Sequence, residues 1–188
     1  MRDLDAALGK IRTAAASRDT TALKATMVEL EVIALQADVL PDTLVDGLSA
    51  LLVDEAFLRL QDSWMVVKFF YDNWMQVTNA QRERLRSVIV RSFDKHADWM
   101  GAFVSAEILG ERFADERALA DLTELARTAT LEERAAVPHG FELLATTAAD
   151  KGLHALALER LQILASSSIQ PLRDEAIHAQ RNTRRRRP

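Results

Sequence analysis

The sequence contains no cysteine, which excludes disulfide bonds, thiol nucleophiles and cysteine-ligated zinc sites. It has only 6 Gly and 4 Pro in 188 residues, so it offers little of the turn chemistry that β-hairpins need. No segment approaches the roughly 20 uncharged apolar residues of a membrane helix, and charges interrupt the first twenty residues, unlike a signal peptide. We therefore expect a protein with no membrane span, located in the cytoplasm.

What the sequence has in abundance is helix formers. Hydrophobic residues make up 48% of the chain, with Ala and Leu prominent among them. This composition predicts an all-α fold, and the length suits one well-buried domain.

Charge is unevenly distributed. The net charge is -4, although the segment 183–188, "TRRRRP", carries four arginines, so the rest of the chain is more acidic than the total suggests. An acidic body disfavours a nucleic-acid surface spread over the whole protein. We expect 183–188 to be a basic, disordered tail; the alternative is an electrostatic arm for nucleic acid, acidic lipid or an acidic partner.

Apolar residues recur at helical spacing along most of the chain. Residues 4–11 and 23–35 predict a first helix pair, with Asp19 or Thr20 as the N-cap of the second helix. Pro41 opens a further helical segment, in which a break is expected near Asp54. Further segments of helix length follow, separated by short polar breaks.

The helices repeat in pairs. Trp64 and Trp99, each followed by Met, lie about 35 residues apart, and the starts of alternate helices recur at about this interval further along the chain. A helix pair repeated with this period is typical of an α-solenoid, in which each pair buries its apolar face against its neighbours.

Two segments resemble HEAT repeats. "AEILGERFADERALADLTELA" (106–126) is similar to the end of a first HEAT helix, a turn with an Asp, and a second helix; "QPLRDEAIHAQ" (170–180) looks like the opening of another repeat. The resemblance implies an α-α superhelix of about four to five helix pairs over residues 1–182, with residues 1–40 as a divergent pair or a cap. Within it, Asp115 would cap the second helix and Gly110 would mark a close approach of helices.

The two repeated tryptophans have two interpretations. We expect Trp64 and Trp99 to fill grooves between adjacent helix pairs, because they repeat at equivalent positions. The alternative is a cofactor-binding or base-stacking role.

Two groups of residues are candidates for partner binding. In the segment 79–93, Leu85, Val88, Ile89 and Phe93 form a core stripe that leaves arginines on the other side. In HEAT proteins second helices line the concave surface, so the resemblance implies that these arginines face a ligand groove. Met65 and Phe69 lie off the main apolar stripe of their helix. The candidate partner-binding residues are thus Arg82, Arg84, Arg86, Arg91, Met65 and Phe69, with a solvated helix face and contacts between repeats as the alternatives.

Catalytic motifs are missing from the sequence. It has no glycine-rich phosphate loop, no His-Glu-x-x-His pair and no Gly-x-Ser-x-Gly elbow, and its four histidines are scattered. We therefore predict no catalytic residue, no metal and no cofactor.

The resulting functional prediction is a non-enzymatic protein-interaction module: an adaptor, a scaffold or a specific inhibitor such as a bacterial toxin-immunity protein. It would bind a protein partner with an acidic surface. The alternatives are a nucleic-acid-binding solenoid similar to alkyl-base DNA glycosylases and a repeat-containing lyase.

Overall fold

A computed structural model describes residues 2–185, with the side chains of residues 4–185. Every regular element in this range is helical, which confirms the predicted all-α fold. None of the helices in this range combines the length and the apolar character that a bilayer crossing requires.

The chain forms two compact units, Met1–Gly101 (unit 1) and Ala102–Pro188 (unit 2), where the sequence predicted one domain over 1–182. Helix α11 continues to Arg185 and buries Thr183, so residues 183–185 belong to a helix and not to the predicted disordered tail. Residues 186–188 of that tail lie outside the described residues.

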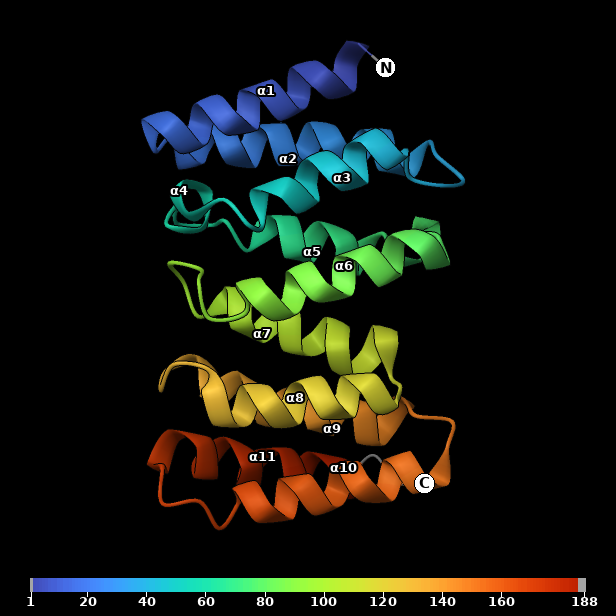
Figure 1. The fold of residues 1–188 in the computed structure, drawn as a ribbon, viewed down its shortest axis with the longest axis vertical. Coiled ribbons are helices and arrows are strands. Elements are labelled where there is room, and N and C mark those ends of the chain that lie inside the picture. The colour runs from blue at the N-terminus through green and yellow to red at the C-terminus, as the bar shows by residue number, and fades with distance from the viewer. Residues whose placement is uncertain (1, 186–188) are drawn as a thin grey trace. The chain divides into compact units, whose positions relative to one another are not determined.

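Unit 1 is built from paired helices (Figure 1). Helix α1 contacts α2, α3 and α4; α2 also contacts α5, and α3 contacts α6. The elements of unit 1 are α1 (Arg2–Ser17), α2 (Thr20–Leu35), α3 (Asp42–Leu51), α4 (Glu55–Leu58), α5 (Met65–Asp72), the 3-10 turn η1 (Trp74–Gln76) and α6 (Asn79–Ser92), and the boundary with unit 2 falls within α7 (Met100–Glu107).

Side-chain caps set the helix starts in unit 1. The Asp19 carboxylate accepts a hydrogen bond from the Ala22 amide at 2.9 Å and caps α2, which confirms that prediction. The expected break near Asp54 is also present, because Asp54 caps the short helix α4. The core of the unit contains fully buried Phe57, Phe70 and Phe93.

In unit 2 the other helices pack around α9, which contacts α8, α10, α11 and the π-helical turn η2. Phe141 and Leu144 of α9 are buried at the centre of these contacts. After the end of α7, the elements of unit 2 are η2 (Ile108–Phe113), α8 (Glu116–Thr128), the 3-10 turn η3 (Glu133–Ala136), α9 (Val137–Thr147), α10 (Lys151–Leu164) and α11 (Gln170–Arg185).

The local predictions for residues 106–126 are confirmed. The Asp115 carboxylate accepts a hydrogen bond from the Ala118 amide at 2.7 Å and caps α8. Gly110 lies so close to α9 that a Cβ there would overlap the carbonyl oxygen of Gly140.

Pro138 stands in the first turn of α9, where its missing N–H costs nothing, so it begins a helix and does not kink one.

Candidate functional site

The predicted arginine helix is α6, and a capping box begins it. The Gln81 amide donates to the Thr78 hydroxyl, and the Thr78 amide donates back to the Gln81 side chain at 2.8 Å. The expected core stripe of Leu85, Val88, Ile89 and Phe93 is buried, which confirms the helical phase.

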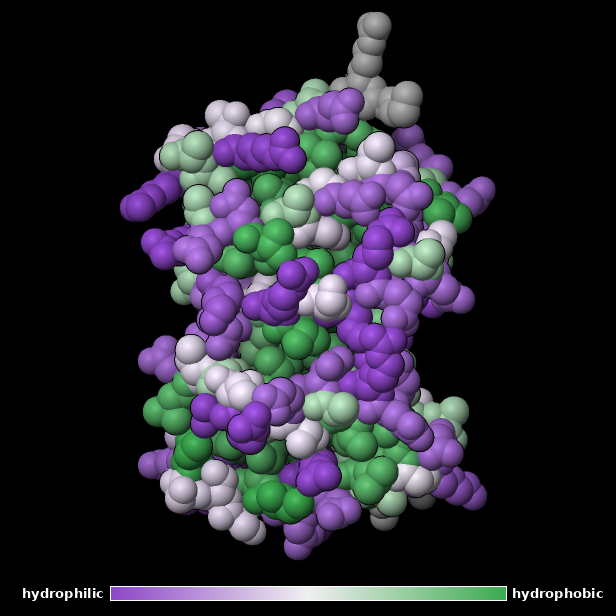
Figure 2. Space-filling view, in the orientation of Figure 1, coloured by the Kyte–Doolittle hydropathy of each residue, from purple (hydrophilic) through white to green (hydrophobic). Residues whose placement is uncertain are grey.

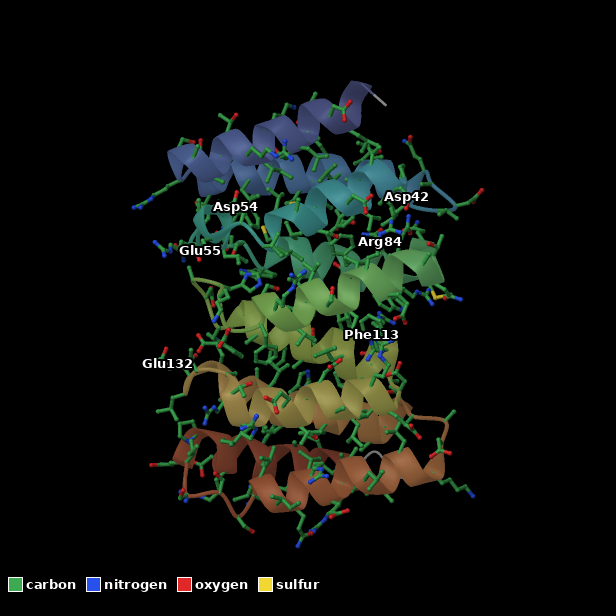
Figure 3. The ribbon with its side chains drawn as sticks, in the orientation of Figure 1. Asp42, Asp54, Glu55, Arg84, Phe113 and Glu132 are labelled. Carbon is green, nitrogen blue, oxygen red and sulfur yellow. The ribbon has the colours of Figure 1, made fainter. Side chains whose placement is uncertain are left out.

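Most of the arginines on α6 are engaged within unit 1. Arg84 lies beside Asp42 of α3 (Figure 3) and forms an ion pair with it at 2.7 Å. A second ion pair joins Arg84 to Asp46, also on α3, at 3.1 Å. Hydrogen bonds from Gln81 and then from Arg84 hold the pKa of the Asp42 carboxyl below its usual value. Arg82 donates to the Trp74 carbonyl at 2.9 Å, and its guanidinium lies 4.9 Å from the centre of the Trp74 ring.

Two of the predicted binding residues are buried and cannot contact a partner in this conformation. Arg86 and Phe69 are 3% and 1% exposed. Phe69 lies within α5, where Val66, Val67 and Phe70 are buried as well, so this short helix is covered on more than one side. After α5 ends at Asp72, the chain passes into the 3-10 turn η1, where Met75 is exposed.

The remaining candidates lie at the surface. Arg91 is exposed and its Nε donates to the Ser87 carbonyl, while Met65 is half-buried. Trp64 is half-buried at the N-cap of α5, and Trp99 is 53% exposed just before α7. The prediction that Trp99 is a core residue is wrong, because it stands ahead of the helix and not within its buried face.

An exposed apolar face that sequence reasoning missed lies on α2. The buried side of α2 carries Leu23, Met27, Leu30 and Ala34. Val28, Val32 and Leu35 repeat this spacing five residues later, which at 100° per residue is about 140° around the helix. These three, the outer seam of α2, are between 51% and 78% exposed, and Val39 in the following loop is also exposed.

Grooves flank the outer seam on both sides. On one side, α2 and α5 enclose a hollow of about 140 Å³ that is lined by Met27, Val28 and the predicted residue Met65. On the other side, a broader hollow of about 450 Å³ runs between α1 and α2 beside Val32.

The lysines that border the outer seam are each paired with a carboxylate of unit 1. Lys10 lies 2.7 Å from Glu29, and Lys68 lies 2.6 Å from Asp72. A third pair joins Lys24 of α2 to Asp62 at 3.0 Å. The border of the seam is therefore largely neutralised.

Unit 2 contains a charged cluster of its own, centred on His139 of α9. The imidazole Nε2 lies 3.3 Å from a Glu107 oxygen and Nδ1 lies 3.8 Å from a Glu142 oxygen. The ring of Phe103 stacks on the imidazole at 4.3 Å, and Asn182 donates to the buried Glu142 at 3.2 Å. The cluster borders a hollow of about 240 Å³ that His178 and Glu175 also line.

The cluster holds His139 in its charged form at neutral pH. Burial lowers the pKa of His139, but the carboxylates of Glu107 and Glu142 outweigh it and raise the pKa to about 9. The arrangement is an internal charge network without a nucleophile among these groups. Within the described residues, no group of three or more His, Asp or Glu side chains is placed to hold a metal ion.

Comparison with known proteins finds no match: no family model, no curated protein and no solved structure is similar to the chain.

Proposed function

We propose that the chain is a non-enzymatic adaptor of HEAT-like helix pairs, and that the outer seam of α2 binds an amphipathic helix of a partner protein. The exposed apolar face of α2 is the observation that carries this proposal. The HEAT-like character is supported by the helix pairs, the Asp115 cap and the close approach at Gly110.

The pattern of α2 indicates the kind of partner. A helix with apolar residues on both sides is normally buried on both sides, whereas α2 covers only one of its two seams within the described residues. The exposed side chains are spaced four and then three residues apart. Side chains with this spacing form the contact stripe of a helix pair, in which each helix inserts its side chains between those of the other. The exposed seam therefore has the geometry of one half of a helix pair.

The charges around the seam favour an apolar contact over an acidic one. Lys10, Lys24 and Lys68 already have carboxylate partners, and Arg84 of α6 has two. An acidic partner would have to displace these pairs, while an apolar helix leaves them in place as a polar rim. For this reason we propose the outer seam of α2, and not the arginines of α6, as the surface that contacts the partner.

The proposal is tested with a photo-crosslinking residue at position 32, in the seam, and a matched one at Leu131, an exposed apolar position of unit 2. In native extract, position 32 should form a covalent adduct with a partner, and position 131 should not. Combined Val28→Asp, Val32→Asp and Leu35→Asp substitutions should abolish capture of that partner, while Leu131→Asp should retain it.

Two results would contradict the proposal. One is capture of the same partner by the triple variant with unchanged affinity. The other is light scattering that shows the wild-type chain as a dimer and the triple variant as a monomer, because the occupant of the seam would then be a second copy of this chain.

A further inference from the structure

A second surface feature, independent of the outer seam, is a pocket in unit 2. It has a volume of about 430 Å³ and lies between the C-terminal parts of α8 and α10 and the start of α11. Its wall is largely apolar. Figure 2 shows hydrophobic and hydrophilic groups mixed over the visible face of the molecule. The apolar lining comes from Ala126, Phe141, Leu164, Ile169 and Leu172.

Three arginines line the same pocket, and they differ in how their charge is balanced. Arg127 forms two bonds to the Glu124 carboxylate, at 2.7 and 3.2 Å. Arg134 donates through Nε to the Ala129 carbonyl, and Arg160 has a buried Nε that lacks a hydrogen-bond partner. Among the described residues, neither Arg134 nor Arg160 has a carboxylate partner, and the side chain of Arg160 makes no hydrogen bond or ion pair.

Leaving such groups without a counter-charge is costly. A guanidinium that is half-removed from water loses part of its hydration, and only an anion or hydrogen-bond acceptor compensates for that loss. Arginine matches a carboxylate particularly well because its planar fork donates two parallel hydrogen bonds. Two such groups beside an apolar wall define a site with one cationic end, which can bind an anion, and one apolar end.

We propose that this pocket binds a small aliphatic carboxylate, with the carboxylate held by Arg134 and Arg160 and the hydrocarbon chain against the apolar wall. The volume lies within the range of roughly 300–1,000 Å³ that small-molecule sites occupy. Arg127 contributes less to binding the anion, because Glu124 already neutralises the charge of Arg127.

Calorimetric titration of the full chain with decanoate, below its micelle concentration and at low salt, tests the site. Decanoate should bind saturably with one site per chain. Decyltrimethylammonium, which has the same chain and the opposite charge, and acetate, which has the head group alone, should each bind at least about tenfold more weakly.

Variants assign the binding to the two arginines. Arg160→Met and Arg134→Met keep the alkyl stem and should each weaken decanoate about tenfold or more, the factor expected for a charge-assisted hydrogen bond. Arg127→Met is the matched control on the pocket rim and should change the affinity less than about threefold, a small fraction of that effect.

A fourth variant keeps the test decisive if an arginine substitution disturbs folding. Ile163 is exposed at the rim of the pocket, so Ile163→Glu should leave the helix content unchanged and weaken decanoate without weakening decyltrimethylammonium. Equal binding of the two amphiphiles, or decanoate affinity that Arg134→Met and Arg160→Met leave unchanged, would overturn the proposal. So would binding of an acidic peptide with no binding of decanoate, which would make the pocket a protein-docking site.

Discussion

Each unit contains one histidine whose pKa is strongly shifted, and the two shifts have opposite directions. In unit 1, His96 is enclosed next to the Ser63 hydroxyl, at 2.9 Å, and burial lowers its pKa to about 4. In unit 2, His139 lies between two carboxylates, which raise its pKa to about 9 in spite of burial. The same side chain is therefore neutral in one unit and charged in the other at neutral pH, because burial outweighs the charge of Asp98 at His96, whereas the two glutamates outweigh burial at His139.

The arginines show the reverse contrast. Arg84 of unit 1 has two aspartate partners on α3, whereas Arg134 and Arg160 of unit 2 have no carboxylate partner among the described residues. Unit 1 thus balances these charges internally and exposes an apolar seam, while unit 2 leaves positive charge beside an apolar pocket. The comparison shows that residue type alone does not assign a role; the neighbours do.

The distribution of tryptophan allows the two units to be followed separately. All three tryptophans of the chain, Trp64, Trp74 and Trp99, lie in unit 1. Tryptophan fluorescence therefore reports on unit 1 alone, and far-ultraviolet circular dichroism reports on the helices of both units.

The largest expected effect is on the buried charge network of unit 2. Glu142→Ala removes one of the two carboxylates that stabilise charged His139 and should lower the free energy of unfolding by about 3–5 kcal/mol. Urea unfolding followed by circular dichroism measures it. Glu142→Gln is the control that keeps the side-chain volume; wild-type stability in that variant would show that the negative charge is not needed.

A somewhat smaller effect is expected at the closest helix contact. Gly110→Ala places a methyl group against the Gly140 carbonyl and should destabilise unit 2 by about 1–3 kcal/mol. The matched control is Gly9→Ala in α1, where no atom lies within 4 Å of the added Cβ and a stabilisation of about 0.5–1 kcal/mol is expected. If the fluorescence midpoint of Gly110→Ala falls as far as the dichroism midpoint, the units unfold together.

The pH dependence of stability should have opposite signs in the two units. His139 has a raised pKa, so its contribution is complete below about pH 6.5 and is lost as the pH rises toward about 9. His96 has a lowered pKa, so unit 1 loses stability as the pH falls from about 6.5 toward about 4. Each slope should be at most about 1.4 kcal/mol per pH unit, because one histidine binds or releases one proton.

Single substitutions separate these slopes from the titration of other groups. His139→Gln should flatten the alkaline loss measured by circular dichroism without changing the fluorescence-detected acid transition. An alkaline loss that persists unchanged in His139→Gln would contradict the assignment.

The smallest effect is expected at Trp99. Because this side chain is 53% exposed, Trp99→Ala should lower the free energy of unfolding by less than about 1 kcal/mol. Trp74→Ala is the comparison, since Trp74 is buried and stacks with Arg82; its loss should cost about 3 kcal/mol or more. Equal costs for the two variants would restore a packing role for Trp99.

Local features were predictable from the sequence because they depend on residues a few positions apart. The caps at Asp19 and Asp115 and the core stripe of α6 follow from short-range spacing. The prediction failed for Phe69 and Arg86, because the packing of α5 and α6 against other helices of unit 1 decides which of their side chains are buried. The outer seam of α2 was visible as a second apolar stripe, but only burial shows which of the two stripes is covered.

By itself, then, the sequence determined an all-α chain and its main helix starts, because helix propensity and hydrogen-bond capping act locally. Tertiary structure alone decided the division into two units, the partners of His139 and the uncompensated charge of Arg160. Those features depend on groups brought together from distant helices, such as Glu107 and His139, 32 positions apart. The pKa and the binding properties of a charged side chain depend on its dielectric environment and on nearby counter-charges. Both arise only when the fold brings distant residues together.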